Sequence, residues 1–290
     1  MTEKNLTGKN ILITGASRGL GSCIARTLRQ KGANLLLTAA TKEKLAQLNS
    51  ELSAGLPAGQ KTHVVVADLK MPDAASIILA EARKLWDRLD VLVNNAAILG
   101  PIGKSWENDW AHWQETLRIN LLAPIQLCRA CLPWMIEKGR GKIINLSGGG
   151  ATGSRPNFSA YATAKTGLVR FSEILAHEVY SMNIQVNCVA PGALNTDMTQ
   201  NILSAGPAKA GEAEYQQAVR QKQNGGTSPQ RAADLCAFLA SPAGDAITGK
   251  LISAVWDSWE KFPNHLEDLK KSDIYTLRRI VPKDRDKNWE

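Results

Sequence analysis

The sequence predicts an α/β fold in which one parallel sheet is covered by helices on both faces. Short apolar runs alternate with longer stretches of helical periodicity, which is typical of a parallel, doubly wound sheet. The first apolar run leads directly into a glycine-rich turn, residues 15–21, and a helical pattern follows it. With 290 residues, the chain is long enough for one large domain with a sizeable core.

Seven apolar runs are expected to form the strands, and together they predict a seven-stranded sheet in a single domain. They are residues 10–14, 34–38, 62–67, 90–93, 142–147, 183–190 and 250–255. Helical patterns follow the strands, among them residues 42–54, 72–86, 107–137 and 228–240. In the long helical region, Asn120 has poor helix propensity and Pro124 follows shortly after, so we expect a local distortion there.

Two segments fit the alternation poorly. Residues 196 to about 226 are less regular, with breaks at Gly206-Pro207 and Gly225-Gly226, and we interpret residues 195–226 as a mobile lid over a substrate. Residues 256–290 form a polar, charged tail with no evident core of their own. The predicted organisation is therefore a catalytic domain over residues 1–255, followed by a tail.

Composition and charge argue against several classes of protein. The net charge of +8 is spread along the chain without a basic block, so a basic cleft is favoured over a nucleic-acid partner. The five cysteines lie in apolar segments, and Cys128 and Cys131 have no second ligand pair nearby, so we expect core packing and no metal site. The N-terminus is too polar for a signal peptide, and no apolar run approaches a membrane span. We expect a cytoplasmic protein with no membrane partner.

The glycine turn has the context of a dinucleotide-binding, Rossmann-type fold. Gly15 permits the tight turn, the later glycines allow close approach, and the helix N-terminus offers free N–H groups to a pyrophosphate. Ligands of such sheets bind beyond the carboxyl ends of the strands, where Gly15, Asp68 and Asn94 all lie.

The predicted cofactor is NADP(H), with NAD less favoured. An NAD-binding fold usually places an acid at the end of the second strand, but this chain has Ala39-Ala40-Thr41-Lys42 there. Arg18 lies inside the glycine turn, where a guanidinium could reach a 2′-phosphate, and Lys42 is a second candidate. The alternative is that Arg18 merely faces solvent.

Tyr161 and Lys165 are the candidate acid/base pair. Four residues apart in a helical pattern, they lie on one helix face, where an ammonium would lower the phenol pKa. A Tyr tuned in this way can exchange a proton with a substrate oxygen, and Ser147 could hydrogen-bond the same oxygen. Taken alone, the pair could also be a chance surface pairing.

Taken together, these motifs resemble the short-chain dehydrogenase/reductase family over residues 8–255, and most closely its 3-oxoacyl-carrier-protein reductase type. The matching motifs are Thr14-Gly15-x-x-x-Gly19-x-Gly21, Asp68, Asn94-Asn95-Ala96, Asn120, Ser147, Tyr161-x-x-x-Lys165 and Pro191-Gly192-x-x-x-Thr196. The resemblance implies an NADPH-dependent oxidoreductase that reduces a carbonyl to an alcohol, or the reverse, and that tends to form a homo-oligomer, a dimer or tetramer.

The resemblance also implies residue roles. Tyr161 would be the acid/base, Lys165 would hold the nicotinamide ribose and lower the Tyr161 pKa, Ser147 would polarise the carbonyl, and Asn120 would anchor a relay water. The implied cofactor contacts are Gly15, Ser17, Arg18, Leu20, Gly21, Asp68, Leu69, Asn94, Ala96, Tyr161, Lys165, Pro191, Gly192, Leu194 and Thr196.

Three departures from the family pattern bear on these roles. The family's Ser usually lies thirteen residues before its Tyr, where this chain has Gly148; Ser147 lies one residue earlier, and Ser154 or Ser159 are alternatives. Ala97 replaces a usual Gly. The last strand lacks the usual Asp-Gly-Gly turn, and Trp256 and Trp259 there would either wall a pocket or pin the tail.

Two other functions stay open for a chain with this pattern. One is an isomerase or dehydratase that uses the same cleft, and the other is a non-catalytic NADP-binding regulator. The substrate is a small molecule that the sequence does not name.

Overall fold

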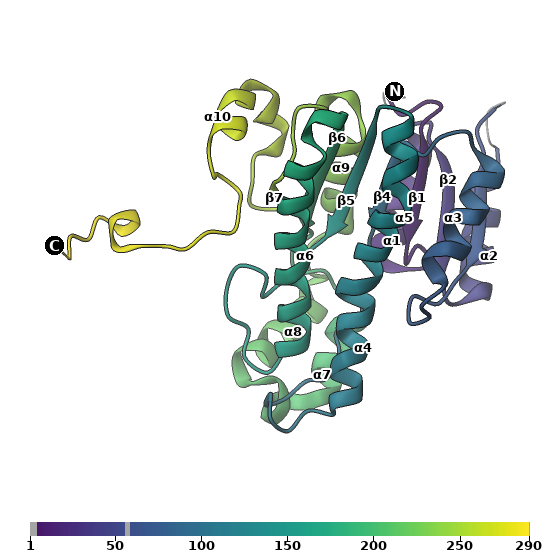
Figure 1. Ribbon diagram of the computed structural model, residues 1–290. Helices are drawn as coiled ribbons and strands as arrows, with labels where there is room; N and C mark the ends of the chain where they lie inside the picture. Colours follow the sequence, from purple (N-terminus) through teal and green to yellow (C-terminus); the bar gives the residue numbers. More distant parts are fainter. Residues whose placement is uncertain (1–4, 56–58, 290) are drawn as a thin grey trace.

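The computed structural model describes residues 5–55 and 59–289, and its centre is a seven-stranded parallel sheet (Figure 1). The strand order is β3-β2-β1-β4-β5-β6-β7, so the chain reverses direction across the sheet between β1 and β4. The strands are β1 (Asn10–Thr14), β2 (Asn34–Ala39), β3 (Thr62–Val66), β4 (Val91–Asn94), β5 (Gly141–Leu146), β6 (Ile184–Ala190) and β7 (Leu251–Ser253). The predicted doubly wound, seven-stranded fold is confirmed.

Helices cover both faces of the sheet because successive strand residues point to opposite sides. Ile11 and Ile13 of β1 pack in one core with α1 (Gly19–Gln30), α2 (Lys42–Ser53) and α9 (Pro229–Ala240). Leu12 packs in the opposite core, which is covered by α3 (Ala74–Leu85), α5 (Ala123–Glu137) and α6 (Ser159–Glu178).

The predicted long helix over residues 107–137 is distorted near Asn120, as expected. It consists of α4 (Trp110–Leu117), a π-helical turn η1 (Arg118–Leu122) and α5. Over the described residues, Trp110–Glu137 is the one stretch long and apolar enough to cross a membrane, contrary to the expectation from sequence, but half of its most apolar window is buried. That burial is typical of a core helix, so the stretch is weak evidence for a membrane span.

Most of residues 195–226, which were expected to be less regular, are helical, so the expected irregularity is corrected, while their role as a lid stays a prediction. It forms α7 (Asp197–Ala210) and α8 (Glu212–Asn224), with a kink at Gly206 and a junction at Gly211, both at positive φ. The helices pack few residues inward, such as Ile202 and Ala218, so their sequences carry only a weak apolar pattern. Both lie at the carboxyl-end edge of the sheet (Figure 1).

The first half of the predicted tail packs on the main core of the domain. The 3-10 turn η4 (Trp259–Asn264) and α10 (Leu266–Lys271) bury Trp259, Phe262 and Leu269 beside α9. Within the tail, the rings of Phe262 and Tyr275 also pack together, with their centres 5.1 Å apart. The chain after about residue 277, with the short turn η5 (Pro282–Arg285), extends away from the body (Figure 1).

Candidate functional site

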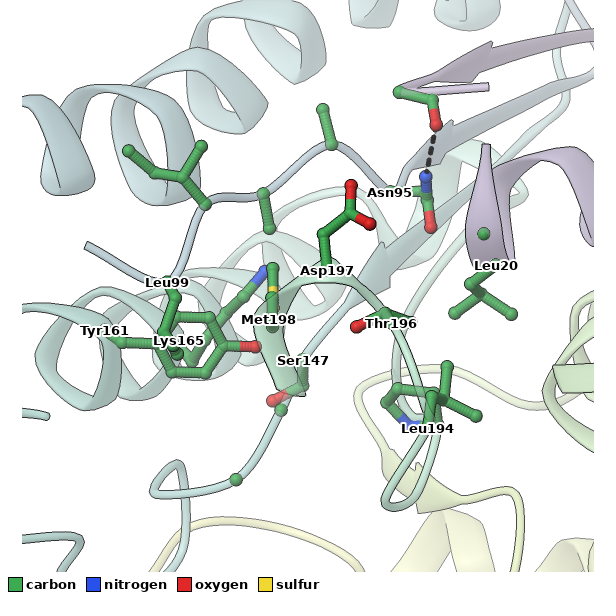
Figure 2. A pocket seen from close by; sticks show the side chains of 18 of the residues that line it. Leu20, Asn95, Leu99, Ser147, Tyr161, Lys165, Leu194, Thr196, Asp197 and Met198 are labelled. Atoms are coloured by element: carbon green, nitrogen blue, oxygen red, sulfur yellow. Dashed lines mark hydrogen bonds between the residues drawn. The ribbon is translucent and has the colours of Figure 1, made fainter. Parts of the chain in front are cut away.

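A cavity of about 1190 Å³ lies at the carboxyl ends of the strands, where the fold predicts a ligand. The loops that follow β1 to β6 form its floor, and residues of α7 and α8 line another side. Figure 2 shows side chains from these different segments facing the same space, among them Leu20, Asn95, Ser147, Tyr161 and Leu194.

Tyr161, Lys165 and Ser147 meet in this cavity. Tyr161 and Lys165 project from one face of α6, both are buried, and the Lys165 Nζ lies 5.9 Å from the centre of the Tyr161 ring (Figure 2). The Lys165 ammonium donates a hydrogen bond to the Leu146 carbonyl at the end of β5, at 2.7 Å. Ser147 follows directly, and its buried hydroxyl has no hydrogen-bond partner in the part of the chain that the structure describes.

The glycine at position 148 is explained by its contact with the Tyr161 hydroxyl. A Cβ built on Gly148 would lie 2.3 Å from the Tyr161 Oη, so no side chain fits there while Tyr161 holds this position. Of the other serines, Ser159 accepts a hydrogen bond from the Trp113 indole at 3.2 Å and does not line the cavity, whereas Ser154 lines it. Among these three serines, Ser147 is the one that precedes Gly148, the residue in contact with the Tyr161 hydroxyl, and its own hydroxyl is unpaired among the described residues.

The electrostatics of the pair differ from the expectation that Lys165 lowers the pKa of Tyr161. Burial raises the pKa of Tyr161 above its usual value, and the cation that opposes this effect is Arg155. Burial also lowers the pKa of Lys165 to about 8, because the ammonium is removed from water.

Arg155 is a residue of the site that the sequence did not reveal. Its guanidinium carbon lies 4.2 Å from the centre of the Phe158 ring and 5.9 Å from that of Tyr161. It donates two hydrogen bonds to Glu214 of α8, from Nε at 3.0 Å and from Nη2 at 2.8 Å. No local pattern marks this pair, because its members are separated by 59 residues along the chain.

The glycine turn fits a dinucleotide phosphate. Gly15 has a φ of +62°, and a Cβ there would lie 2.7 Å from the Cα of Ala96, so only glycine allows the turn to approach the loop after β4. Helix α1 begins after Arg18 without a side-chain cap and without an acid in its first turn. Its N-terminal N–H groups and positive dipole end therefore face the cavity ready for an anion.

The predicted cofactor contacts line the cavity, with one exception. Asn94 is buried and donates to the Asn145 Oδ1 at 2.8 Å, which ties β4 to β5, and the cavity is lined instead by the next residue, Asn95. Asn120 does not line the cavity either. The Asn120 Oδ1 accepts a hydrogen bond from the Ile98 N–H at 2.9 Å, and the Asn120 Nδ2 donates one to the Ile98 carbonyl at 2.7 Å. Through these two bonds Asn120 positions the loop after β4.

The two tryptophans after β7 have different positions. Trp256 lines the cavity rim and is 86% exposed, whereas Trp259 is buried and pins the tail to α9. Lys42, the second candidate for a phosphate contact, opens α2 and does not line the cavity.

Comparisons with known proteins agree with this geometry. The chain is 34% identical over 252 residues to a 3-oxoacyl-(acyl-carrier-protein) reductase of Vibrio cholerae, covering 86% of this chain and 96% of that relative. It is 30% identical over 253 residues to human dehydrogenase/reductase SDR family member 4, covering 87% and 88% of the two chains.

A solved structure from Beutenbergia cavernae, titled a putative NAD(P) dependent gluconate 5-dehydrogenase with bound NADP, superposes with a TM-score of 0.76. It is 27% identical in sequence, and the match covers 87% of this chain and 96% of that chain. A family model described as short chain dehydrogenase matches residues 9–206. With a match over most of its length, this chain belongs to the short-chain dehydrogenase/reductase family and is an NAD(P)-dependent oxidoreductase.

Proposed function

We propose that this protein is an NADP(H)-dependent enzyme that reduces a carbonyl to an alcohol, or runs the reverse reaction, with Tyr161 as the acid/base. The observation that carries the proposal is the convergence of Tyr161, Lys165 and the unpaired hydroxyl of Ser147 in the cavity that also contains the glycine turn. The relatives are named for different substrates, an acyl-carrier-protein thioester and gluconate, so their names support the reaction class and leave the substrate open.

The side chains divide the proton chemistry among them. The nicotinamide would supply or accept the hydride. Tyr161 donates a proton to the substrate oxygen during reduction, and its raised pKa keeps it protonated at neutral pH. Ser147 donates a hydrogen bond to the same oxygen, where negative charge develops. Lys165 holds the nicotinamide ribose, and Asn120 keeps the loop after β4 in place through Ile98.

NADP is proposed over NAD on the charges at the adenosine end of the cavity. Ala39, Ala40 and Thr41 line this end and carry no acid that would repel a 2′-phosphate. Arg18 lies beside them, 62% exposed, in an ion pair with Asp197 at 3.2 Å. An exposed pair of this kind is weak, so the guanidinium can exchange Asp197 for a phosphate. The Beutenbergia cavernae structure, titled NAD(P) dependent, holds NADP at low occupancy and so supports binding of a cofactor of this class.

The proposal includes a cytoplasmic homo-oligomer, a dimer or tetramer, that acts on a small molecule. The exposed side chains of Trp106 and Trp110 support a subunit contact near α4, since large exposed apolar groups are typical of interfaces.

The test measures the absorbance of reduced nicotinamide with a panel of ketones and alcohols, for the wild type and Tyr161→Phe. We expect turnover by the wild type, its loss in the variant, and NADPH binding by both proteins in calorimetry. If the wild type binds NADPH but transforms nothing, the protein is a cofactor-binding regulator. If product forms without net oxidation or reduction of the cofactor, the protein is an isomerase or dehydratase and not a reductase.

A further inference from the structure

The ion pair between Arg155 and Glu214 places a carboxylate inside the cavity, next to the residue proposed as acid/base. Both side chains are largely removed from solvent, with 17% and 25% of their surfaces exposed. Both line the cavity, as do the amides of Gln217 and Gln221 on α8. The cavity wall near Tyr161 therefore contains a guanidinium that binds a carboxylate, and in this structure the carboxylate is that of Glu214.

Arg155 is held in place independently of Glu214. Its guanidinium carbon lies 4.2 Å from the centre of the Phe158 ring, and Phe158 is itself fully buried. The remaining nitrogen, Nη1, lies on the side of Gly149, and no described residue accepts a hydrogen bond from it. A planar guanidinium fixed on an aromatic ring, with a free N–H edge, is suited to a bidentate carboxylate.

Glu214 is carried by an element with few anchors. It lies in the first turn of α8, three residues after the Gly211 junction, and Ala218 is the one residue of α8 that is buried. Its other side-chain ties are a hydrogen bond from Asn157 to the Ala210 carbonyl at 3.2 Å and one from Lys222 of α8 to Gln200 of α7 at 3.1 Å. Displacing the Glu214 carboxylate therefore requires little movement of the core.

An unpaired guanidinium in this position is unfavourable, because a partly buried charge that loses its partner also lacks full hydration. Glu214 can leave at low cost only when another anion takes its place. A neutral substrate cannot provide that exchange, whereas a substrate with its own carboxylate can. The distance of 5.9 Å between the guanidinium carbon and the Tyr161 ring centre limits the carboxylate to a few bonds from the reacting carbonyl.

Building on the proposed function, we infer that the substrates are short oxo acids or hydroxy acids, and that Arg155 binds their carboxylate in exchange for that of Glu214. Arg155 is then the specificity-determining residue of the site, and Glu214 is a built-in competitor that occupies the anion position until substrate arrives.

The experiment compares each acid with its neutral methyl ester: pyruvate, acetoacetate and levulinate, which place the carbonyl at increasing distance from the carboxylate. The kinetic constants are measured for the wild type, Arg155→Gln, Arg155→Lys and Glu214→Gln. Arg26→Gln is the matched control, because Arg26 forms a bidentate pair with Glu51 away from the cavity. Calorimetry on the protein–NADP⁺ complex gives the affinity for the same acids and esters without turnover, and circular dichroism checks the fold of each variant.

We expect at least one acid to exceed its ester in kcat/KM by about tenfold or more. Arg155→Gln should lower the kcat/KM of that acid by about 100-fold, at least tenfold more than it lowers that of the ester. Part of the loss is common to both, because the variant also removes the cation that opposes the raised pKa of Tyr161. Arg155→Lys keeps the charge without the bidentate geometry, so an intermediate loss is expected. Glu214→Gln removes the competitor and should lower the KM of the acid, and Arg26→Gln should match the wild type.

Two results would overturn the inference. If no acid exceeds its ester in either kcat/KM or affinity, the substrate class is wrong, even when neutral ketones are reduced and the proposed function stands. If Arg155→Gln and Glu214→Gln weaken acids and esters equally, the pair only fastens α8. Conversely, acids that bind in an Arg155-dependent manner without any oxidation of NADPH would support the inference and contradict the proposed reaction.

Discussion

Replacing Lys165 by Met should stabilise the protein at neutral pH while it abolishes turnover. The Lys165 side chain is 1% exposed, and burial lowers its pKa from 10.5 to about 8. Each pKa unit corresponds to about 1.4 kcal/mol, so the charged form costs the folded state about 3 kcal/mol below pH 8. The variant loses the hydrogen bond to the Leu146 carbonyl, and this loss destabilises it by about 1 kcal/mol.

The net gain at pH 7 is therefore about 2 kcal/mol, or a rise in Tm of roughly 4 °C for a chain of this size. The sign of the pH dependence follows from the depressed pKa. The unfolded state holds the proton up to about pH 10.5 and the folded state only up to about pH 8, so wild-type stability rises with pH between these values. The difference between wild type and Lys165→Met should shrink over the same interval.

Urea unfolding without cofactor at pH 7, 8, 9 and 10 measures this difference, and an activity assay with NADPH checks the loss of function. Lys84→Met, at a side chain that is 68% exposed, is the control and should change stability by less than about 0.5 kcal/mol. A Lys165→Met protein that is less stable than the wild type at pH 7, or a difference independent of pH, would refute the reasoning.

Three further predictions follow from the same contacts. Gly148→Ala places a Cβ 2.3 Å from the Tyr161 Oη and should lower kcat by about 100-fold with NADPH affinity retained in calorimetry; an unchanged kcat would contradict the contact. Arg18→Ala should weaken NADPH binding by about tenfold or more and leave NADH binding unchanged, whereas equal losses would argue against a phosphate contact. Trp259→Ala should lower the free energy of unfolding by about 3–5 kcal/mol and expose the tail to limited proteolysis, while Trp256→Ala, at an 86% exposed side chain, should be neutral.

The parts of this protein that could be predicted from sequence are those that depend on short-range pattern. Runs such as Asn10–Thr14 show the sheet because every residue of a doubly covered strand is apolar or buried. The glycine turn and the Tyr161–Lys165 pair are local spacings, and the structure brings both to the same cavity. The distortion at Asn120 is local as well, and it appears as the π-helical turn.

The remaining features depend on contacts between distant segments. Helices α7 and α8 pack too few residues inward to show a clear period, and the apolar residues of the tail are buried in the core that also contains α9. Asn94 and Asn95 are adjacent in sequence, but their side chains point in different directions. Asn94 bonds Asn145 of β5, whereas Asn95 bonds the carbonyls of Thr14 and Gly15 and lines the cavity.

The sequence alone predicted the fold class, the glycine turn and the candidate acid/base, because each depends on residues close together along the chain. Tertiary structure alone decided the pKa values of Tyr161 and Lys165, the need for glycine at 148 and the pairing of Arg155 with Glu214. Burial and the distance between groups set these properties, and both arise only when segments far apart in the sequence pack together.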